Sequence, residues 1–137
     1  MAAQCIFCKI VNREIPSEQV YENDKVYAFL DIKPINRGHT LVIHKHHHAD
    51  IFDSPEEDLK DLMTASKHVA IAAQKAMKAD GINIGMNNRP AAGQVVMHAH
   101  LHVIPRFSKD GLRHWPGREY TPEELKVDAD AIRKALK

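Results

Sequence analysis

The sequence of 137 residues predicts an α+β fold with an antiparallel sheet. Several short runs show the period-two alternation or apolar density of strands, and one long run repeats its apolar residues with the three- and four-residue spacing of a helix. The strand-like runs do not alternate with helices, so the βαβ pattern of a parallel sheet is missing. We expect one domain over residues 1–137, because a chain of this length can bury its own core.

The first elements are a short helix or turn and two neighbouring strands. The residues VYAFL at 26–30 and HTLVIH at 39–44 are rich in β-branched and aromatic side chains. Pro34 and Gly38 mark the loop between them. The apolar positions expected to face inward from the N-terminal helix or turn, which precedes Pro16, are Ile6, Phe7, Ile10 and Ile15.

A long helix is expected next. Ser54 is a candidate N-cap, with Pro55 at the first helical position and Glu57 completing a capping box. The helix is expected to end at Asp80-Gly81. Its core-facing stripe is predicted to contain Leu59, Leu62, Met63, Ser66, Val69, Ala70, Ala73 and Met77.

Two further strands and a final helix complete the prediction. The strands are INIGMNN from Ile82 and VVMHAHLHVI at 95–104, joined by the loop RPAAGQ. The final helix begins at Thr121-Pro122-Glu123-Glu124, which is another capping box.

Composition limits the class of partner. The 19 Lys and Arg residues against 18 Asp and Glu give a formal charge of +1, so we expect no nucleic acid and no anionic membrane surface as partner. No apolar run has the length of a signal peptide or a membrane span. The chain is therefore expected to be cytoplasmic. Only two cysteines occur, and a bridge between them would close a very small loop, so a disulfide framework is excluded.

The strand at 95–104 carries three histidines at alternate positions. Its core face would hold Met97, Ala99, Leu101 and Val103, while His98, His100 and His102 would share the other face about 7 Å apart. Imidazole rings at so short a distance repel one another when charged. Their pKa values should therefore fall and leave at least one ring neutral. A neutral imidazole is a nucleophile or a metal ligand, and the row is otherwise plain solvated surface.

The loop before this strand favours an anion site. Asn87 and Asn88 supply side-chain amides, and the turn through Gly93-Gln94 can aim backbone N–H groups at an anion. No Walker A pattern is present, and no pair of carboxylates lies near the strand in sequence to hold magnesium. Phosphoryl chemistry here is expected to need no catalytic metal.

The chain resembles the histidine triad (HIT) superfamily, in its Hint-like branch of nucleotide-binding proteins. The resemblance is carried by HAHLHVI at 98–104, by the segments at 5–43 and 87–107, and by HWPG at 114–117. It implies a HIT-like fold with a five-stranded antiparallel sheet, one long helix and a C-terminal helix. It also implies a symmetric homodimer across which the sheet extends.

The resemblance implies a catalytic set of His98, His100 and His102. His100 matches the nucleophile that attacks the α-phosphate, and His102 matches the group that binds the phosphate and assists the leaving group. Asp31 matches the carboxylate that binds the ribose. The phosphate contacts implied are Asn87, Gly93, Gln94 and the Val95 N–H, and the apolar slot for the base is implied to be Ile6, Phe7, Ile10, Phe29 and Ile32. Val95 departs from the branch, which often has a hydroxyl residue there.

Cys5-x-x-Cys8 has the spacing of half a zinc site. A redox dithiol is disfavoured, because no strand precedes the pair. The resemblance implies a structural zinc held by Cys5, Cys8, His47 and His98, and the alternative is two reduced thiols beside an exposed histidine run. His39 is expected to brace the triad by hydrogen bonding.

The function implied is a purine nucleotide-binding hydrolase. It would cleave AMP- or GMP-linked substrates, such as nucleoside 5′-phosphoramidates and aminoacyl-adenylates, through a nucleotidyl-histidine. Three alternatives remain open: a dinucleoside polyphosphate hydrolase, a non-catalytic module for nucleotide sensing or protein interaction, and an enzyme whose three histidines hold one catalytic zinc.

Overall fold

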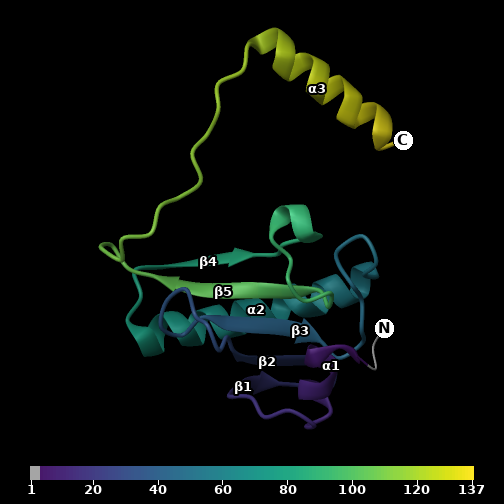
Figure 1. The fold of residues 1–137 in the computed structure, drawn as a ribbon. Helices are drawn as coiled ribbons and strands as arrows, with labels where there is room; N and C mark the ends of the chain where they lie inside the picture. The colour runs from purple at the N-terminus through teal and green to yellow at the C-terminus, as the bar shows by residue number, and fades with distance from the viewer. Residues whose placement is uncertain (1–3) are drawn as a thin grey trace.

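The computed structural model describes residues 4–137, in which five strands form one antiparallel sheet of order β1-β2-β3-β5-β4 (Figure 1). The prediction of an α+β fold with an antiparallel sheet is confirmed. The strands are β1 (Gln19–Glu22), β2 (Val26–Leu30), β3 (Thr40–His44), β4 (Gly81–Gly85) and β5 (His100–Arg106). The helices are α1 (Ile6–Val11), α2 (Glu56–Met77), the 3-10 turn η2 (Pro90–Ala92) and α3 (Pro122–Ala135).

Helices cover both faces of the sheet. On one face α2 packs Leu62, Ala65 and Val69 against strand residues that include Leu101 and Val103. On the other face α1 packs Phe7 and Ile10 against Tyr27, Phe29, Leu41 and Ile43. Because side chains alternate along β5, the residues on either side of Leu101, His100 and His102, point toward the α1 face. His100 and His102 therefore lie on a covered face of the sheet.

The strand expected at 95–104 begins five residues later, at His100, and continues to Arg106. Met97 was predicted in the core and is exposed. The segment before His100 bonds to loops instead of to a strand: the Ala99 N–H donates to the His48 carbonyl at 2.7 Å. The Val96 carbonyl accepts from the Gln94 side chain. These loop contacts take backbone groups that a longer ladder would have needed.

The ends of α2 also differ from prediction. Its N-cap is Pro55 without a side-chain cap bond, because the Ser54 hydroxyl donates to the Asp50 carbonyl and the capping box does not form. The helix ends at Met77, with Lys78 in the left-handed conformation at φ 56°. It stops before Asp80-Gly81 because the Asp80 N–H already donates to Arg106 at the end of β5.

Two side chains on the predicted helix faces are exposed. Met63 on α2 faces solvent, and Ala65 is buried in its place. Ile6 on α1 is also exposed, whereas Phe7 and Ile10 are buried as expected. β1 was not recognised from residue pattern, although the resemblance implies five strands. Its four residues are only half-buried at most, so they lack a strong apolar signal.

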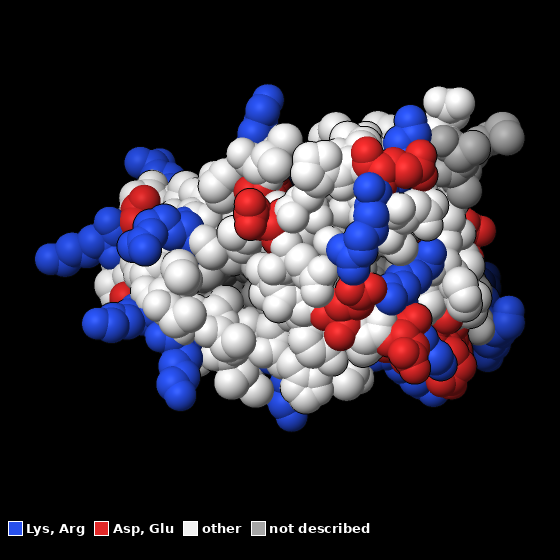
Figure 2. Space-filling view, turned by 90° about the horizontal axis from the view of Figure 1, so that it is seen from below, with Lys and Arg blue, Asp and Glu red and all other residues white. Residues whose placement is uncertain are grey.

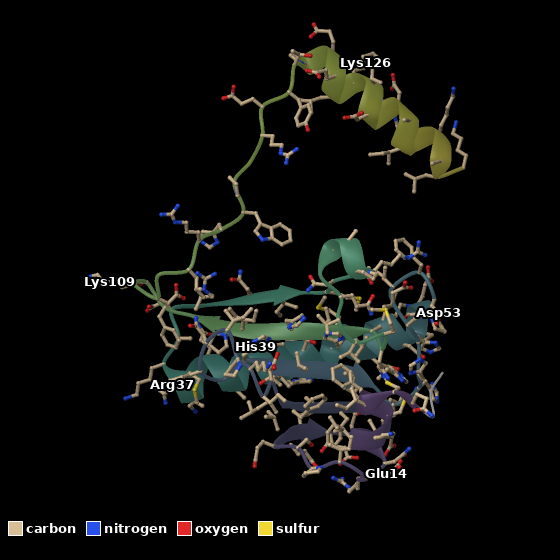
Figure 3. All side chains as sticks on the ribbon, in the orientation of Figure 1. Glu14, Arg37, His39, Asp53, Lys109 and Lys126 are labelled. Atoms are coloured by element: carbon tan, nitrogen blue, oxygen red, sulfur yellow. The ribbon has the colours of Figure 1, made fainter. Side chains whose placement is uncertain are left out.

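The residues after Leu112 form a C-terminal arm, defined here as residues 113–137. Its helix α3 begins as predicted, with Thr121 and Glu124 completing a capping box. No residue of α3 is buried, and the side chains of α3, Lys126 among them, stand clear of the sheet (Figure 3).

The surface carries both signs of charge. On the face in Figure 2, several Asp and Glu side chains lie beside Lys and Arg side chains, while other basic side chains project at one end. Within residues 4–137, no helix combines the length and the apolar character needed to cross a bilayer.

Candidate active site and metal centre

The three histidines of the triad are more enclosed than a solvated strand face would allow. His98 lies just before β5 and is 1% exposed, His100 is 6% exposed, and His102 is half-buried. The ring of Phe7 from α1 meets the ring of His100 edge-on, with centroids 5.1 Å apart. The reading of this row as plain solvated surface is wrong, because α1 covers it.

Burial makes all three rings easier to keep neutral. It is the largest cause that lowers the pKa of His98 to about 4 and the pKa of His102 to about 4, with neighbouring histidines adding to both. Burial also lowers the pKa of His100. Mutual repulsion, the cause expected from the sequence, is secondary to burial. Each imidazole therefore has one N–H and one lone pair at neutral pH.

The tautomer of His100 follows from one contact. Its Nδ1 lies 2.7 Å from the backbone carbonyl of His98. A carbonyl oxygen can only accept, so Nδ1 carries the proton and donates to it. The lone pair of the neutral ring is consequently on Nε2.

The tautomer of His102 follows from a chain of two contacts. The Ile35 N–H donates to Nδ1 of His39 at 3.0 Å, which places the His39 proton on Nε2. That Nε2 lies 2.9 Å from Nδ1 of His102 and donates to it. His102 must then carry its own proton on Nε2, so it presents a donor. His39 braces the triad through this hydrogen bond, as the sequence led us to expect.

The loop through η2 uses most of its own backbone N–H groups. Those of Ala92 and Gln94 donate to the Arg89 carbonyl, and that of Gly93 donates to the Pro90 carbonyl. Gly93 and Gln94 were predicted to contact phosphate, but the backbone N–H of each is already used within the loop. Among residues 4–137, nothing accepts a hydrogen bond from the Val95 N–H.

The Gln94 side chain is also occupied within the protein. Its Oε1 accepts from the Arg89 N–H at 2.6 Å. Its Nε2 donates to the carbonyls of Ala49 and Val96. This amide holds Arg89 at φ 74°, which is unfavourable for a residue other than glycine. Gln94 is therefore a brace for the loop.

Asn87 lies where the loop meets the triad. A Cβ atom on Gly93, which has φ 94°, would come within 3.5 Å of the Asn87 Nδ2. Asn87 also lines one cleft together with His102. The structure thus brings together Asn87, Gly93 and His102 as predicted neighbours, and their contact with phosphate stays a prediction.

The residues expected to hold the nucleoside differ in accessibility. Ile32 is 92% exposed, and Ile6 is also exposed, whereas Phe7, Ile10 and Phe29 are buried between α1 and the sheet. Asp31 is half-buried, and its Oδ2 lies 3.7 Å from Nε2 of His39. The roles of these residues toward base and ribose stay predictions.

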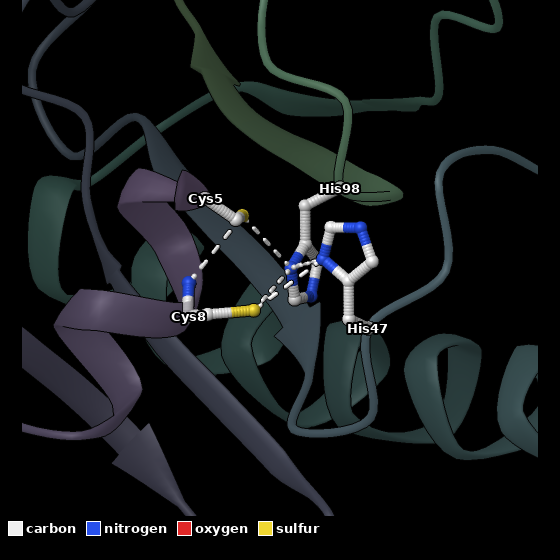
Figure 4. Close-up of side chains that lie close together, drawn as sticks. All are labelled: Cys5, Cys8, His47 and His98. Carbon is white, nitrogen blue, oxygen red and sulfur yellow. Dashed lines mark hydrogen bonds between the residues drawn. The ribbon is translucent and has the colours of Figure 1, made fainter. Parts of the chain in front are cut away.

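Four predicted metal ligands converge at the end of α1 (Figure 4). Nδ1 of His98 lies 3.2 Å from Nδ1 of His47, 3.4 Å from Sγ of Cys5 and 3.6 Å from Sγ of Cys8. Nδ1 of His47 lies 3.3 Å from Sγ of Cys8. A tetrahedral zinc with ordinary bond lengths separates its ligand atoms by about 3.3–3.8 Å. The four side chains therefore fit a zinc ion.

The tautomer of His98 suits a cation, whereas the Cys8 thiol must lose a proton to bind one. Nε2 of His98 donates to the His44 carbonyl at 2.8 Å, so its Nδ1 lone pair faces the two sulfur atoms. Burial raises the pKa of the Cys8 thiol to about 11, and the nearby Cys5 adds to the shift. Binding a metal would release thiol protons.

The sequence reading missed a second group of side chains beside this centre. His44, His46 and His48 meet Asp58 and Asp61 of α2. The histidine run was noticed in the sequence, but no sequence signal linked it to carboxylates ten or more positions away.

Comparisons with known proteins agree with this geometry. A family model described as HIT domain matches residues 12–109. An adenosine 5′-monophosphoramidase from Saccharomyces cerevisiae is 48% identical over 125 residues, covering 90% of this chain and 77% of that protein. A HIT family protein from Bacillus subtilis superposes with a TM-score of 0.90 at 40% identity, covering 98% of each chain. A zinc-bound histidine triad family protein from Mycobacterium smegmatis gives 0.78 at 38% identity, covering 98% of this chain and 99% of that one.

Proposed function

This chain belongs to the HIT domain family, and from that membership we propose that it is an enzyme that hydrolyses AMP-linked substrates through a nucleotidyl intermediate on His100. Nucleoside 5′-phosphoramidates and aminoacyl-adenylates are the substrate class. The similarity to the yeast adenosine 5′-monophosphoramidase supports this choice.

The observation that carries the proposal is the proton on His100 Nδ1. Because the His98 carbonyl holds that proton at 2.7 Å, Nε2 keeps a lone pair for attack on phosphorus. Burial lowers the pKa of His100 and so preserves that lone pair at neutral pH. A nucleophile fixed in one tautomer by the backbone loses little entropy on reaching the transition state.

The reaction has two steps. In the first, His100 Nε2 attacks the α-phosphorus, the bond from phosphorus to the amine or acyl group breaks, and its electron pair leaves with that group. The His102 Nε2–H donates a hydrogen bond to the departing atom, and the Val95 N–H donates to a phosphoryl oxygen. A departing amine takes the His102 Nε2 proton. In the second step water attacks phosphorus, a water proton returns to His102 Nε2, and the electron pair of the phosphorus–nitrogen bond returns to His100 Nε2. Over both steps water supplies hydroxide to phosphorus and a proton to the leaving group.

A panel of substrates tests the proposed activity. We expect an AMP–amine conjugate to be turned over with a higher kcat/KM than a dinucleoside polyphosphate or a nucleotide sugar, because the Nε2–H of neutral His102 assists a poor leaving group. A preference for the dinucleoside polyphosphate would support that alternative activity instead. Tight AMP binding without turnover of any member would favour a nucleotide-sensing module, which Val95 in place of a hydroxyl residue keeps open.

We further propose that Cys5, Cys8, His47 and His98 hold a structural zinc. The spacing of their ligand atoms and the zinc-bound relative from Mycobacterium smegmatis support this assignment. A zinc with four protein ligands has no open position and supplies structural cross-linking instead of activated water. Its ligand His98 also supplies the carbonyl that orients His100. The metal centre thus bears on the nucleophile through one residue.

We also propose that residues 1–137 form one HIT domain that pairs as a symmetric homodimer. The edge strand β4 has no neighbour on its outer side within residues 4–137, and α3 buries none of its residues. The exposed apolar side chains of α3 are Leu125, Val127 and Ile132. Sedimentation equilibrium should give twice the 15.5 kDa of one chain, and Ile132→Asp should weaken the dimer while Lys126→Gln should not. A monomer at micromolar concentration would refute this pairing.

A further inference from the structure

Three histidines from the end of β3 and the connection after it converge on one carboxylate in the first turn of α2. Asp58 Oδ2 lies 2.7 Å from Nε2 of His48 and 3.5 Å from Nδ1 of His46. Asp58 Oδ1 lies 3.4 Å from Nε2 of His44. Asp61, one turn further along α2, lies 3.2 Å from the same His44 nitrogen. We call His46, His48 and Asp58 the outer histidine site.

The local backbone explains why neighbouring histidines serve two different groups. His47 reaches toward Cys8 and His98, whereas His46 and His48 on either side of it reach toward Asp58. Asp58 lies in the first turn of α2. The two groups therefore share one peptide segment but contact different partners.

Proton positions divide the three histidines into two roles. Nδ1 of His44 accepts from the His46 backbone N–H at 3.0 Å, so the proton of neutral His44 is on Nε2. From there it donates toward Asp61 and Asp58. His44 is thus a positioning residue that orients the carboxylates and has no lone pair to offer a metal. His46 and His48 differ from His44 because their second ring nitrogens have no hydrogen-bond partner among residues 4–137. Each ring can carry its proton on that nitrogen and turn a lone pair toward Asp58 when a metal binds.

We propose that the outer histidine site binds a divalent transition-metal ion through His46, His48 and Asp58. Two imidazoles and a carboxylate are the ligands that Ni²⁺, Cu²⁺ and Zn²⁺ take in sites open to solvent. The two measured nitrogen-to-oxygen separations, 2.7 and 3.5 Å, are close to the roughly 2.9–3.4 Å between adjacent ligands at bond lengths of about 2.1 Å.

Exposure and charge also suit a cation here. The His46 side chain is 73% exposed, which provides an entry path and leaves room for water to complete the coordination. Asp61 adds a second negative charge beside Asp58, held through the shared His44 N–H. Carboxylate ligands fixed by such hydrogen bonds bind metals more tightly. The site has no sulfur ligand, unlike the cysteine centre.

The test is calorimetric titration of Ni²⁺ into protein already loaded with one equivalent of zinc. We expect one further Ni²⁺ per chain, without the sulfur-to-nickel charge-transfer absorption that displacement of zinc from the cysteines would produce. His46→Ala should weaken Ni²⁺ binding at least about tenfold. Because His46 is exposed, this variant should fold normally, which thermal unfolding of the zinc-loaded protein checks.

A matched pair of charge variants makes the test specific. Asp58→Asn removes the carboxylate ligand and should also weaken Ni²⁺ binding at least about tenfold. Glu57→Gln removes the same charge one residue earlier, from a side chain that pairs only with Lys60 among residues 4–137, and should leave the affinity nearly unchanged. Absence of the second equivalent, or equal affinity in wild type and His46→Ala, would mean that these side chains form only a hydrogen-bonded cluster.

Discussion

Replacing His100 by Gln is expected to lower kcat for an AMP–amine conjugate by about 10⁴-fold or more. Glutamine keeps a polar side chain of similar length beside Phe7 but has no nitrogen lone pair that can attack phosphorus. The residual rate would come from binding and from donors such as His102. Single-turnover hydrolysis with saturating enzyme measures the chemical step directly.

The control for this experiment is His68→Gln. His68 is exposed on α2 and stacks on Tyr21, away from the triad. The His68→Gln variant makes the same chemical change as His100→Gln and should leave kcat within about twofold, as expected for a surface site. If His100→Gln retained more than a tenth of wild-type turnover while folded, His100 would not be the nucleophile.

The second large effect is expected at the metal centre. Cys8→Ser should reduce bound zinc from one ion per chain to a small fraction, and the free energy of unfolding should fall by about 3–5 kcal/mol, or about 10–17 °C in Tm. The proposed ion would join α1 to the segments carrying His47 and His98, so its loss would free three parts of the chain at once. Elemental analysis and thermal unfolding measure the two quantities.

The control is the zinc content of His100→Gln, because that variant separates two accounts of the metal. A structural zinc at Cys5, Cys8, His47 and His98 should remain in it. If the three triad histidines instead held one catalytic zinc, the metal would survive Cys8→Ser and disappear with His100→Gln. That pattern would overturn the assignment of the cysteine centre.

Local sequence pattern predicted the elements whose signals are strong. β2 and β3 combine dense apolar residues with clear loop markers, and α3 has a capping box that forms as expected. The predicted capping box at the start of α2 did not form because the Ser54 hydroxyl donates to the Asp50 carbonyl four positions earlier. The capping pattern does not reveal this competing local bond. The start of β5 was misplaced for a different reason, because a contact from a loop distant in sequence, the Ala99 N–H to the His48 carbonyl, holds the residues before His100.

The site was predictable in its residues but not in its environment. A period-two strand does not reveal which of its faces a helix far away in sequence will cover, so the burial of His98 and His100 could not be foreseen. The tautomers likewise depend on single contacts, such as the Ile35 N–H on His39. Whether the backbone N–H groups of Gly93 and Gln94 are free depends on the hydrogen bonds within their own loop. The ligand set Cys5, Cys8, His47 and His98 came from the resemblance, since its members are separated by up to 93 positions.

The identity of the atom that attacks phosphorus is tested most directly by trapping the intermediate. Rapid quenching of a reaction with an AMP conjugate labelled in the α-phosphate, followed by peptide mapping under conditions that preserve phosphorus–nitrogen bonds, should recover label on Nε2 of His100. Label on another residue, or product formed in the first turnover with no labelled peptide at any quench time, would contradict the account.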